Sequence, residues 1–418
     1  MARLPLALQG LSRDGRLLFA TRFIRLVAYG ALSVVLVLYL IGVGLTEPQA
    51  GLVLTLTLVG DTAVSLYLTT RADRLGRRRM LIIGALLMTA AGIAFALTNN
   101  LWLLVVAGVI GVVSPSGQEV GPFLPIEQAA LSHVVTDRTR TDVFAWYTLV
   151  GSMATAVGAL AAGTVTRTLQ SNGWDTVGSY RTVVVLYAAF GIVLAVLFSR
   201  LSRAAEAATL GEKRALSSPF AALSGVDESR TVVLKLSSLF ALDAFGGGFV
   251  VQSLAAYWFH LRFGVDAGTL GGIFFLANVL AGISALLASR LAARIGLVTT
   301  MVVTHLPSNV LLILVPLMPT LPLAIAMLLI RFSISQMDVP TRQSYLMAVV
   351  APSERSAAAG IAGVARTTGA AISPLFVGAM FARPWLMNVP FYIAGTLKIA
   401  YDLLLYRAFV SVRPPEET

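Results

Sequence analysis

Two polar side chains, Gln118 and Glu119, lie in a stretch that is otherwise apolar and rich in proline and glycine. Between Ser114 and Pro125 the chain holds Pro115, Gly117, Gly121, Pro122 and Pro125. Because an interior proline removes a helix hydrogen bond and clashes with the preceding turn, the sequence predicts a broken helix here. Irregular backbone inside a membrane is tolerated only where it is buried in protein or lines a wet cavity. Glu119 is therefore our first candidate for a group that binds a proton or a solute. The alternative is that this stretch bulges toward one side of the membrane and leaves Glu119 solvated.

Two further carboxylates, Asp61 and Asp243, interrupt apolar runs and are candidates for proton coupling. A carboxylate that is desolvated inside a membrane can take up and release a proton near neutral pH. Asp243 is followed by Gly246, Gly247 and Gly248, which favour a hinge or a close approach to a neighbouring helix. For Asp61, the alternative is a structural hydrogen bond to a neighbouring helix.

An arginine and a glutamate occupy equivalent positions of an internal repeat. Residues 125–160 align with residues 340–375 without a gap, which places Arg342 opposite Glu127. This charge-complementary pair predicts a gate between two halves that breaks when one side opens. The alternative is that each residue pairs inside its own half, for example Arg342 with Asp338 one turn earlier. Charges inside apolar runs are functional candidates by default. The candidates for substrate binding are Gln118, Glu127, Asp338, Arg342 and Arg366.

Other polar residues in the apolar runs are expected to have structural roles. Arg22 and Arg25 lie three residues apart near the start of the first run, where long side chains can reach lipid headgroups. Lys235 and Asp402 are expected to be anchors at the membrane interface, and His305 is expected to be packed or to line a pore. The histidines show no spacing typical of metal ligands, cysteine is absent, and there is no phosphate-binding loop. The sequence therefore predicts no metal, no cofactor and no enzymatic activity.

The composition places all these residues in a membrane protein. Hydrophobic residues make up 57% of the chain and charged residues 12%, with a mean hydropathy of +0.83. Apolar runs of about 20 residues, the length needed to cross a bilayer, recur along the whole sequence. We predict an all-α protein with twelve transmembrane helices. The approximate spans are 18–42, 50–70, 79–98, 101–133, 143–167, 180–200, 232–261, 266–288, 297–317, 320–349, 357–381 and 388–409.

The distribution of positive charge predicts the orientation of these spans. Of the 31 Lys and Arg residues, twenty lie in the two termini and in alternate connections, and only four lie in the opposite connections. Because positive loops are retained in the cytoplasm, both termini are expected to be cytoplasmic, in a multi-pass protein of the cell's inner membrane. This topology accounts for the net charge of +11, so no nucleic-acid partner is expected.

A dense basic turn, Arg71–Arg79, separates the second and third apolar runs. It resembles the loop between helices 2 and 3 of the major facilitator superfamily, which reads roughly Gly-x-x-x-Asp-Arg-x-Gly-Arg-Arg. Thr69 stands where the family has its leading glycine, which in the family allows a tight contact between helices 2 and 11. The matching residues, which the resemblance makes the cytoplasmic gate loop, are Asp73, Arg74, Gly76, Arg77 and Arg78.

The resemblance extends over nearly the whole chain and implies two pseudo-symmetric six-helix halves. The longest polar connection, 201–230, is predicted to be a cytoplasmic linker between halves at 1–200 and 231–418. The eleventh run carries Gly360, Gly369, Pro374 and Gly378, a pattern similar to the motif that drug/proton antiporters carry in helix 5. Pro374 therefore joins Gly246–Gly248 as a hinge candidate. The helix 4 arginine typical of those antiporters is absent, with Ala107 near its expected place.

The resemblance further implies a secondary active transporter in which the two halves rock around a substrate site at the membrane midplane. The expected partners are the bilayer, a small-molecule substrate and protons, and a monomer is expected because most family members are monomeric. The leading prediction is proton-coupled efflux of a neutral or cationic amphipathic solute. One alternative is proton-coupled uptake or exchange of an organic anion bound by Arg342, Arg366 and Arg25. Another is a transporter-like sensor or lipid flippase.

Overall fold

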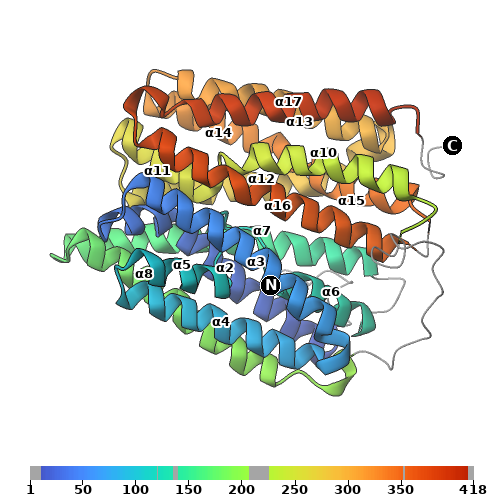
Figure 1. Ribbon diagram of the computed structural model, residues 1–418, viewed down its shortest axis with the longest axis horizontal. Coiled ribbons are helices and arrows are strands. Elements are labelled where there is room, and N and C mark those ends of the chain that lie inside the picture. Colours follow the sequence, from blue (N-terminus) through green and yellow to red (C-terminus); the bar gives the residue numbers. More distant parts are fainter. Residues whose placement is uncertain (1–10, 120, 135–139, 207–225, 352–353, 413–418) are drawn as a thin grey trace, which may run out of the picture. The chain divides into compact units, whose positions relative to one another are not determined.

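A computed structural model describes residues 11–119, 121–134, 140–206, 226–351 and 354–412 of the chain. Within these ranges every regular element is a helix, as Figure 1 shows. In this part of the chain, ten helical segments are long and apolar enough to cross a membrane, and two of them join consecutive α-helices. The predicted all-α membrane class is therefore confirmed.

The helices follow one another along the sequence with short connections. The first half of the sequence forms α2 (Arg13–Gly42), α3 (Glu47–Leu75), α4 (Arg77–Leu97), α5 (Leu101–Ile110), α6 (Phe123–Val134), α7 (Arg140–Ser171), α8 (Thr176–Ser199) and the 3₁₀ turn η1 (Arg203–Ala205). The second half forms α10 (Arg230–Gly248), α11 (Gln252–Phe263), α12 (Ala267–Ile295), α13 (Leu297–Leu314), η2 (Val315–Leu317), α14 (Leu321–Ser335), α15 (Asp338–Val349), α16 (Arg355–Phe381), η3 (Pro384–Leu386) and α17 (Val389–Phe409).

Each of the twelve predicted spans corresponds to one helix or to a pair of consecutive helices. The paired spans are 101–133, formed by α5 and α6; 232–261, formed by α10 and α11; and 320–349, formed by α14 and α15. The last span, α17, is 21 residues long and carries Lys398 and Asp402 among its buried residues. The count of twelve therefore agrees with the helices observed.

Helix ends are fixed by local interactions that the sequence explains. At the start of α3, Thr46 and Gln49 form a reciprocal capping box, in which the Gln49 side chain accepts from the Thr46 N–H at 2.9 Å. Within the basic turn, a single residue, Gly76, connects α3 to α4. Its φ is +101°, a conformation that glycine adopts without strain. Gly296 takes the equivalent place between α12 and α13, with φ +83°.

The chain divides into two compact units. Unit 1 contains Met1–Leu210 and Gln252–Val279, and unit 2 contains Gly211–Val251 and Leu280–Thr418. Helix α11 and the first part of α12 therefore belong to unit 1, although they follow the predicted linker in the sequence. Gln252 Nε2 donates to Ser33 Oγ at 2.8 Å, and the Tyr257 hydroxyl donates to Glu47 Oε1 at 3.1 Å. The predicted domain boundaries at 200 and 230 remain a prediction.

Within unit 1, helix α2 packs against α7 and α8, and small residues let it approach α7 closely. A Cβ built on Gly30 would lie 2.2 Å from the Thr155 carbonyl oxygen. A Cβ on Gly158 would lie 2.1 Å from the carbonyl oxygen of Val27. Close backbone contact at small residues is the usual way that helices associate inside a membrane.

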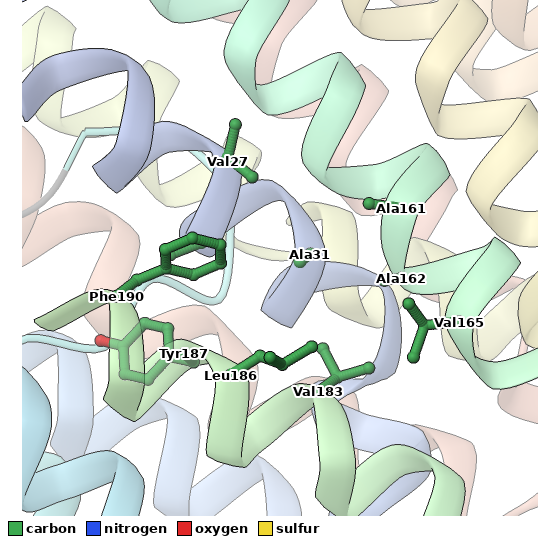
Figure 2. Close-up of a pocket in the computed structure, with 10 residues that line it drawn as sticks. Val27, Ala31, Ala161, Ala162, Val165, Val183, Leu186, Tyr187 and Phe190 are labelled. Carbon is green, nitrogen blue, oxygen red and sulfur yellow. The ribbon is translucent and has the colours of Figure 1, made fainter. Parts of the chain in front are cut away.

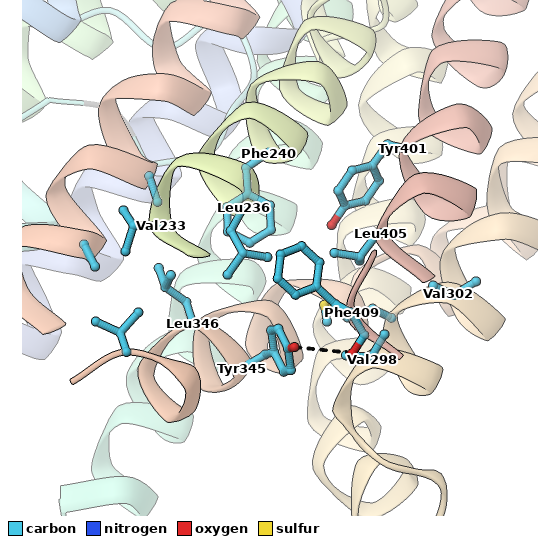
Figure 3. Packing of buried hydrophobic residues seen from close by; sticks show 14 of the residues in the cluster. Val233, Leu236, Phe240, Val298, Val302, Tyr345, Leu346, Tyr401, Leu405 and Phe409 are labelled. Atoms are coloured by element: carbon cyan, nitrogen blue, oxygen red, sulfur yellow. Dashed lines mark hydrogen bonds between the residues drawn. The ribbon is translucent and has the colours of Figure 1, made fainter. Parts of the chain in front are cut away.

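Within unit 2, helix α10 packs against α16 and α17, and α13 packs against α14, α15 and α17. A cluster of buried aromatic and aliphatic side chains fills the end of this unit around Phe240, Tyr345 and Phe409 (Figure 3). The Tyr345 and Phe409 rings meet edge to face with centroids 6.0 Å apart, and the Tyr345 hydroxyl donates to the Val412 carbonyl at 3.0 Å. The polar end of this tyrosine is thus satisfied inside an apolar cluster.

Candidate functional site

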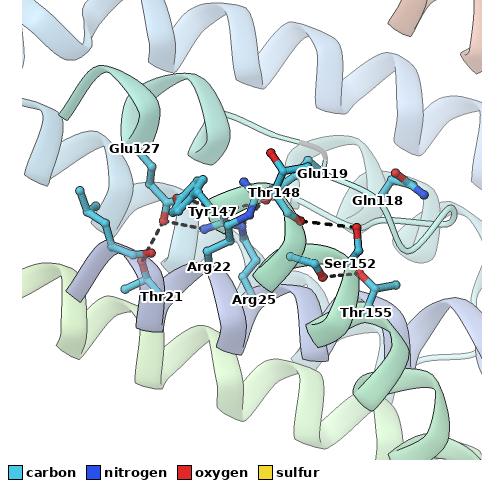
Figure 4. A network of polar contacts seen from close by, with 12 residues as sticks. Thr21, Arg22, Arg25, Gln118, Glu119, Glu127, Tyr147, Thr148, Ser152 and Thr155 are labelled. Carbon is cyan, nitrogen blue, oxygen red and sulfur yellow. Dashed lines mark hydrogen bonds and ion pairs between the residues drawn. The ribbon is translucent and has the colours of Figure 1, made fainter. Parts of the chain in front are cut away.

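A buried network of four charges in unit 1 joins Arg22 and Arg25 of α2 to Glu119 and Glu127 (Figure 4). Arg25 is 0% exposed and binds both oxygens of Glu127. Its Nη1 donates to Oε1 at 2.7 Å and its Nη2 donates to Oε2 at 2.6 Å. This planar, two-pronged geometry is the strongest form of arginine–carboxylate pairing.

Glu127 has two further partners in the same network. The Thr21 hydroxyl donates to its Oε1 at 2.9 Å, and the Tyr147 hydroxyl donates to its Oε2. The Tyr147 ring also lies beneath the guanidinium of Arg22, with 4.3 Å between Cζ and the ring centroid. Glu127 is therefore a fully compensated buried carboxylate.

Glu119 is the more accessible acid of this network, with 12% of its side chain exposed. Its Oε1 lies 3.0 Å from Arg22 Nη1, and it accepts from Arg25 Nη2 at 3.1 Å and from Arg25 Nε at 3.3 Å. Arg25 is thus shared between the two glutamates. Gln118, its neighbour, is exposed.

The helix break around Glu119 is present as predicted, because α5 ends at Ile110 and α6 begins at Phe123. Polar contacts hold the intervening backbone. Ser114 Oγ donates to the Gln118 carbonyl at 2.7 Å, and Thr155 Oγ1 of α7 donates to the Gly117 carbonyl at 3.1 Å. Gly117 and Gly121 have φ of +67° and +79°. The prolines and glycines of this stretch therefore form an ordered, hydrogen-bonded turn.

Asp61 lies on α3 beside this break, fourteen residues from Glu47 and fourteen from Leu75, the two ends of the helix. It is 3% exposed. Its Oδ2 accepts the backbone N–H of Gly121 at 3.0 Å, and its Oδ1 is buried without a hydrogen-bond partner. Among the described residues no cation forms an ion pair with this carboxylate.

The expected role of Arg22 and Arg25 as headgroup anchors is wrong, because both side chains are buried in the network. The predicted span began at residue 18, but α2 begins at Arg13. Arg25 is therefore twelve residues into the helix, roughly 18 Å along its axis at about 1.5 Å per residue. That is too far for its guanidinium to reach the end of the helix.

A second buried network lies in unit 2 around Asp243 of α10. Lys398 Nζ of α17 donates to its Oδ1 at 2.5 Å, and Arg342 Nη1 of α15 donates to its Oδ2 at 3.1 Å. Arg342 also pairs with Asp338, one turn earlier on α15, at 3.2 Å. Two cations and two carboxylates from three helices are thus joined inside one unit.

A histidine extends this network to α13 and α17. His305 Nδ1 lies 2.8 Å from Asp402 Oδ1, and its Nε2 lies 3.8 Å from Asp243 Oδ1. Asn309 Nδ2 donates to the other oxygen of Asp402 at 2.9 Å. The expectation that Asp402 is an interfacial anchor is wrong, because the residue is 0% exposed and bound by α13.

Sequence reasoning did not assign Lys398, His305 or Asn309 to the site. The signal that could have found them is their spacing. Lys398 and Asp402 lie four residues apart on α17, and His305 and Asn309 lie four apart on α13, so each pair shares one face of its helix. Lys235, the other lysine of the unit 2 membrane helices, is exposed.

Glu127 and Arg342, which the repeat aligns, each have a partner inside their own unit. Glu127 binds Arg25, and Arg342 binds Asp243 and Asp338. The described contacts therefore follow the alternative of separate pairing, including the pairing of Arg342 with Asp338 one turn away. A gate formed between Glu127 and Arg342 remains a prediction.

Two other arginines of unit 2, Arg331 on α14 and Arg366 on α16, make no ion pair with any described carboxylate. Each is partly exposed, and each has a buried Nε without a hydrogen-bond partner. Arg331 lies over the ring of its neighbour Phe332, with 5.1 Å between Cζ and the ring centroid. Arg342 and Arg366 were both predicted to bind substrate, but they differ in pairing. Arg342 is paired with two carboxylates, and Arg366 is paired with none of the described ones.

The hinge candidates of α10 and α16 mark a close contact between these two helices. Helix α10 ends at Gly248, and a Cβ built there would lie 2.5 Å from the Ala370 carbonyl oxygen of α16. Ser373, which precedes Pro374 in α16, donates its hydroxyl to the Phe245 carbonyl at 2.5 Å. The glycines therefore allow helix packing as well as the break between α10 and α11, and hinge motion at Gly246–Gly248 and Pro374 remains a prediction.

In the gate loop, Arg77 and Arg78 begin α4, and their backbone N–H groups donate to Glu206 at 2.6 and 3.3 Å. Glu206 thus caps the positive end of α4. The Arg77 side chain is buried and donates to the Ala129 and Ala205 carbonyls at 3.3 and 3.4 Å. The side chains of Asp73 and Arg74 lie outside the described residues.

A small cavity in unit 1 is lined by residues that do not belong to the charged network of that unit. It is bounded by α2, α7 and α8, and Figure 2 shows the residues that line it, among them Val27, Ala161, Val183 and Phe190. Its lining is apolar apart from Tyr187, whose hydroxyl donates to the Val112 carbonyl. This cavity therefore lacks the charged groups expected of a site that binds ions. In the described part of the chain, no group of His, Asp and Glu is arranged to hold a metal ion.

A comparison with protein-family models identifies the class of protein. The model of the Major Facilitator Superfamily matches residues 18–337, which is more than half of the chain. The chain belongs to the major facilitator superfamily. The family that the basic turn resembles is therefore confirmed, and the protein is a multi-pass membrane protein of a family of secondary transporters.

Two curated relatives of this superfamily member differ in how much of the chain they cover. An uncharacterized membrane protein of Saccharomyces cerevisiae, YJR124C, is 32% identical over 426 residues, which cover 96% of this chain and 95% of the yeast protein. A Na(+), Li(+), K(+)/H(+) antiporter of Planococcus maritimus is 31% identical over 111 residues, 27% of this chain and 26% of the antiporter.

Solved structures of superfamily transporters share the fold. A bacterial homologue of the human lysosomal transporter Spinster, inward-facing and occupied, has a TM-score of 0.70 and 16% identity, covering 96% of this chain and 97% of that one. The nucleoside transporter NupG has a TM-score of 0.75 and 11% identity over 95% of this chain and 100% of its own. A D-xylose-proton symporter has a TM-score of 0.70 and 15% identity over 94% and 97%. At these identities the likeness concerns the fold alone.

Proposed function

We propose that this protein is a proton-coupled secondary transporter in which Asp61 binds the coupled proton. The observation that carries the proposal is the environment of Asp61, a carboxyl that is 3% exposed and has no cation beside it among the described residues. An ionised carboxylate in this place would be a buried charge without compensation, which is costly in a membrane interior. Binding a proton removes that charge.

The charges of the unit 1 membrane helices support this choice over Glu119, the first candidate from the sequence. Arg22 and Arg25 pair with Glu119 and Glu127, so these four charges balance. Asp61, near the middle of α3, has no such ion pair among the described residues. Protonation of Glu119 would instead leave two buried arginines sharing one carboxylate, Glu127, which is an expensive state.

The position of Asp61 also supplies a route from proton binding to conformational change. Asp61 accepts the N–H of Gly121, two residues from Glu119, and Glu119 holds both arginines of α2. A neutral carboxyl accepts this hydrogen bond less strongly than a carboxylate does. We therefore propose that the proton changes the stability of the α5–α6 break and, through Glu119, the position of α2.

We further propose that transport is exchange, with protons entering as a solute leaves, by a monomer in the cytoplasmic membrane. The partial similarity to a Na(+), Li(+), K(+)/H(+) antiporter supports exchange, although it covers only 27% of the chain. Proton-coupled uptake is the competing direction. A sensor or lipid flippase would show no proton flux linked to a soluble solute.

The proton site can be tested without knowing the substrate. The purified protein is reconstituted in lipid, and its infrared spectrum is recorded as the pH is varied. We expect a carbonyl band of a protonated carboxyl that Asp61→Asn removes and that Glu119→Gln leaves in place. Asp266→Asn, at an exposed loop position, is the matched control. A band that persists in Asp61→Asn and disappears in Glu119→Gln would move the proton site back to Glu119.

Transport is then measured in liposomes that contain a pH-sensitive dye. A panel of benzoate, succinate, choline and tetraphenylphosphonium is added to wild-type, Asp61→Asn and Asp266→Asn protein. We expect solute-dependent proton movement in the wild type and in Asp266→Asn, and its loss in Asp61→Asn. The direction of the proton movement distinguishes exchange from uptake. Equal flux in wild type and Asp61→Asn would refute the proposal.

A further inference from the structure

The membrane helices of unit 2 contain an unmatched positive charge. Among the described residues, their buried or partly buried Arg, Lys, Asp and Glu side chains are four cations, Arg331, Arg342, Arg366 and Lys398, and three acids, Asp243, Asp338 and Asp402. An excess charge in a low-dielectric interior requires a counter-charge, which for unit 2 is an anion.

The acids of unit 2 bind other groups, and none of the described acids forms an ion pair with Arg331 or Arg366. Asp243 binds Lys398 and Arg342, and Asp338 binds Arg342. Asp402 binds His305 and Asn309 on α13.

Arg331 and Arg366 are the cations left with free donors. In each, Nε is buried and has no hydrogen-bond partner, while the residue as a whole is partly exposed. A buried guanidinium N–H without an acceptor is an unsatisfied group that a ligand oxygen can satisfy. The two guanidiniums therefore combine unused donors with access from outside the protein interior.

The two arginines belong to one region of unit 2. Both interact electrostatically with Asp243 and Asp338, and Arg366 also experiences the like charge of Arg342. Ser335 lies one helical turn after Arg331 on α14, on the same face, and its buried hydroxyl has no partner. An anion in this region would reduce the repulsion between Arg366 and Arg342 and would accept from the serine.

We infer that Arg331 and Arg366, with the hydroxyl of Ser335, form a binding subsite for the carboxylate or phosphate group of an organic anion. Guanidinium groups bind both kinds of oxyanion through paired hydrogen bonds. The same charges repel a cation, so the expectation of a cationic solute is replaced by an anionic one. The inference deepens the proposed function, because it supplies the substrate class for the transport that Asp61 is proposed to couple.

Binding can be measured separately from proton coupling. The purified full-length protein is titrated at constant ionic strength with benzoate, succinate and inorganic phosphate, and with tetraethylammonium as the cationic probe. Saturable thermal stabilisation reports binding, because a ligand that binds only the folded state raises its stability. The carboxylates and phosphate distinguish the two oxyanion classes.

The variants are Arg331→Gln, Arg366→Gln and, as a matched control at an exposed position, Arg383→Gln. We expect at least one anion to bind saturably to the wild type and to Arg383→Gln, and tetraethylammonium not to bind. Each of the two site variants should raise the apparent Kd by about tenfold, the effect of losing one charge-assisted hydrogen bond. Arg366→Lys, which keeps the charge but not the paired N–H donors of the guanidinium, should raise the apparent Kd less.

Three results would overturn the subsite. They are the absence of saturable anion binding to the wild type, anion binding that both glutamine variants retain, and saturable binding of tetraethylammonium that benzoate does not displace. The first and third results are obtained with the wild type alone, so they can refute the inference even if a variant fails to fold. Anion binding that depends on both arginines in a protein without proton flux would instead keep the subsite and reject the proton coupling.

Discussion

Arg25 of α2 binds Glu127 of α6 through both carboxylate oxygens, at 2.7 and 2.6 Å, inside a region where neither side chain is exposed. Unit 2 contains a similar pair with the charges exchanged, in which Asp243 of α10 binds Arg342 of α15 at 3.1 Å. The gap-free repeat aligns Glu127 with Arg342. A buried ion pair therefore joins α2 to α6 in unit 1 and α10 to α15 in unit 2, and the two pairs have opposite polarity.

The first prediction concerns the strength of this pair in unit 1. Arg25→Gln leaves Glu127 as an uncompensated buried carboxylate, so we expect a loss of about 3–5 kcal/mol in the free energy of unfolding. Thermal unfolding in detergent measures the loss. Arg25→Lys keeps the charge but not the two-pronged geometry, and we expect it to fall between Arg25→Gln and the wild type.

The double variant Arg25→Gln with Glu127→Gln tests the cause of that loss. With both charges removed, no buried charge is left unpaired, and part of the stability lost in Arg25→Gln should return. If the losses of the two single variants simply add in the double variant, then Arg25 and Glu127 do not stabilise each other.

Arg25 also illustrates what limited the sequence analysis. Its burial could not be predicted because the apolar run begins at residue 18, whereas the helix begins at Arg13, where Ser12 accepts the Gly15 N–H at 3.1 Å. A polar first turn with a serine cap is invisible to a hydropathy pattern. The partner of Arg25 is 102 residues away in the sequence, and single-sequence patterns carry no information on such a contact.

Features set by local backbone chemistry were predictable. The prolines and glycines between Ser114 and Pro125 predicted the break between α5 and α6, and Gly246–Gly248 favoured a close approach to a neighbouring helix, which Gly248 makes with α16. The burial of Asp402 was not predictable, although its helix has the predicted bounds, because its partners His305 and Asn309 come from α13. The location of charges was thus readable from sequence, and their pairing across helices was not.

The second prediction concerns the contact between α2 and α7. A Cβ on Gly158 would lie 2.1 Å from a backbone oxygen of Val27, which a side-chain rotation cannot relieve. We expect Gly158→Ala to lower the free energy of unfolding by about 1–3 kcal/mol through overpacking. Gly360→Ala is the matched control, because nothing lies within 4 Å of its Cβ and alanine favours a helix by up to about 1 kcal/mol. Equal thermal stability of the two variants would contradict the close contact.

The third prediction concerns Glu354, which lies outside the membrane-spanning segments and caps the start of α10. Burial acts to raise the pKa of Glu354, but hydrogen bonds donated by the backbone N–H groups of Ser229, Asp227 and Glu228 outweigh it and lower the pKa. A lowered folded-state pKa means that the cap stabilises the protein above the ordinary pKa of glutamate. Its contribution is lost as the pH falls through the lowered value.

The corresponding measurement compares the wild type with Glu354→Gln by thermal unfolding between neutral and acidic pH. We expect the variant to be less stable by about 0.5–2 kcal/mol at neutral pH, as for the loss of a helix cap, and the difference to shrink as the pH falls. Glu228→Gln, an exposed position that contributes only its backbone N–H, should show no such pH-dependent difference. A difference that grows toward acidic pH would reverse the assigned sign.

The fourth prediction concerns the orientation of the chain, which rests on the excess of Lys and Arg in alternate connections. Because the chain contains no cysteine, a single introduced cysteine reports its own side of the membrane. Asn172 lies between α7 and α8, and Arg203 lies in η1 after α8, so one membrane span separates them and both are exposed. In intact cells a membrane-impermeant maleimide should label Asn172→Cys and should reach Arg203→Cys only after permeabilisation. The reverse pattern would place both termini outside, and the direction of proton-coupled exchange proposed here would reverse with it.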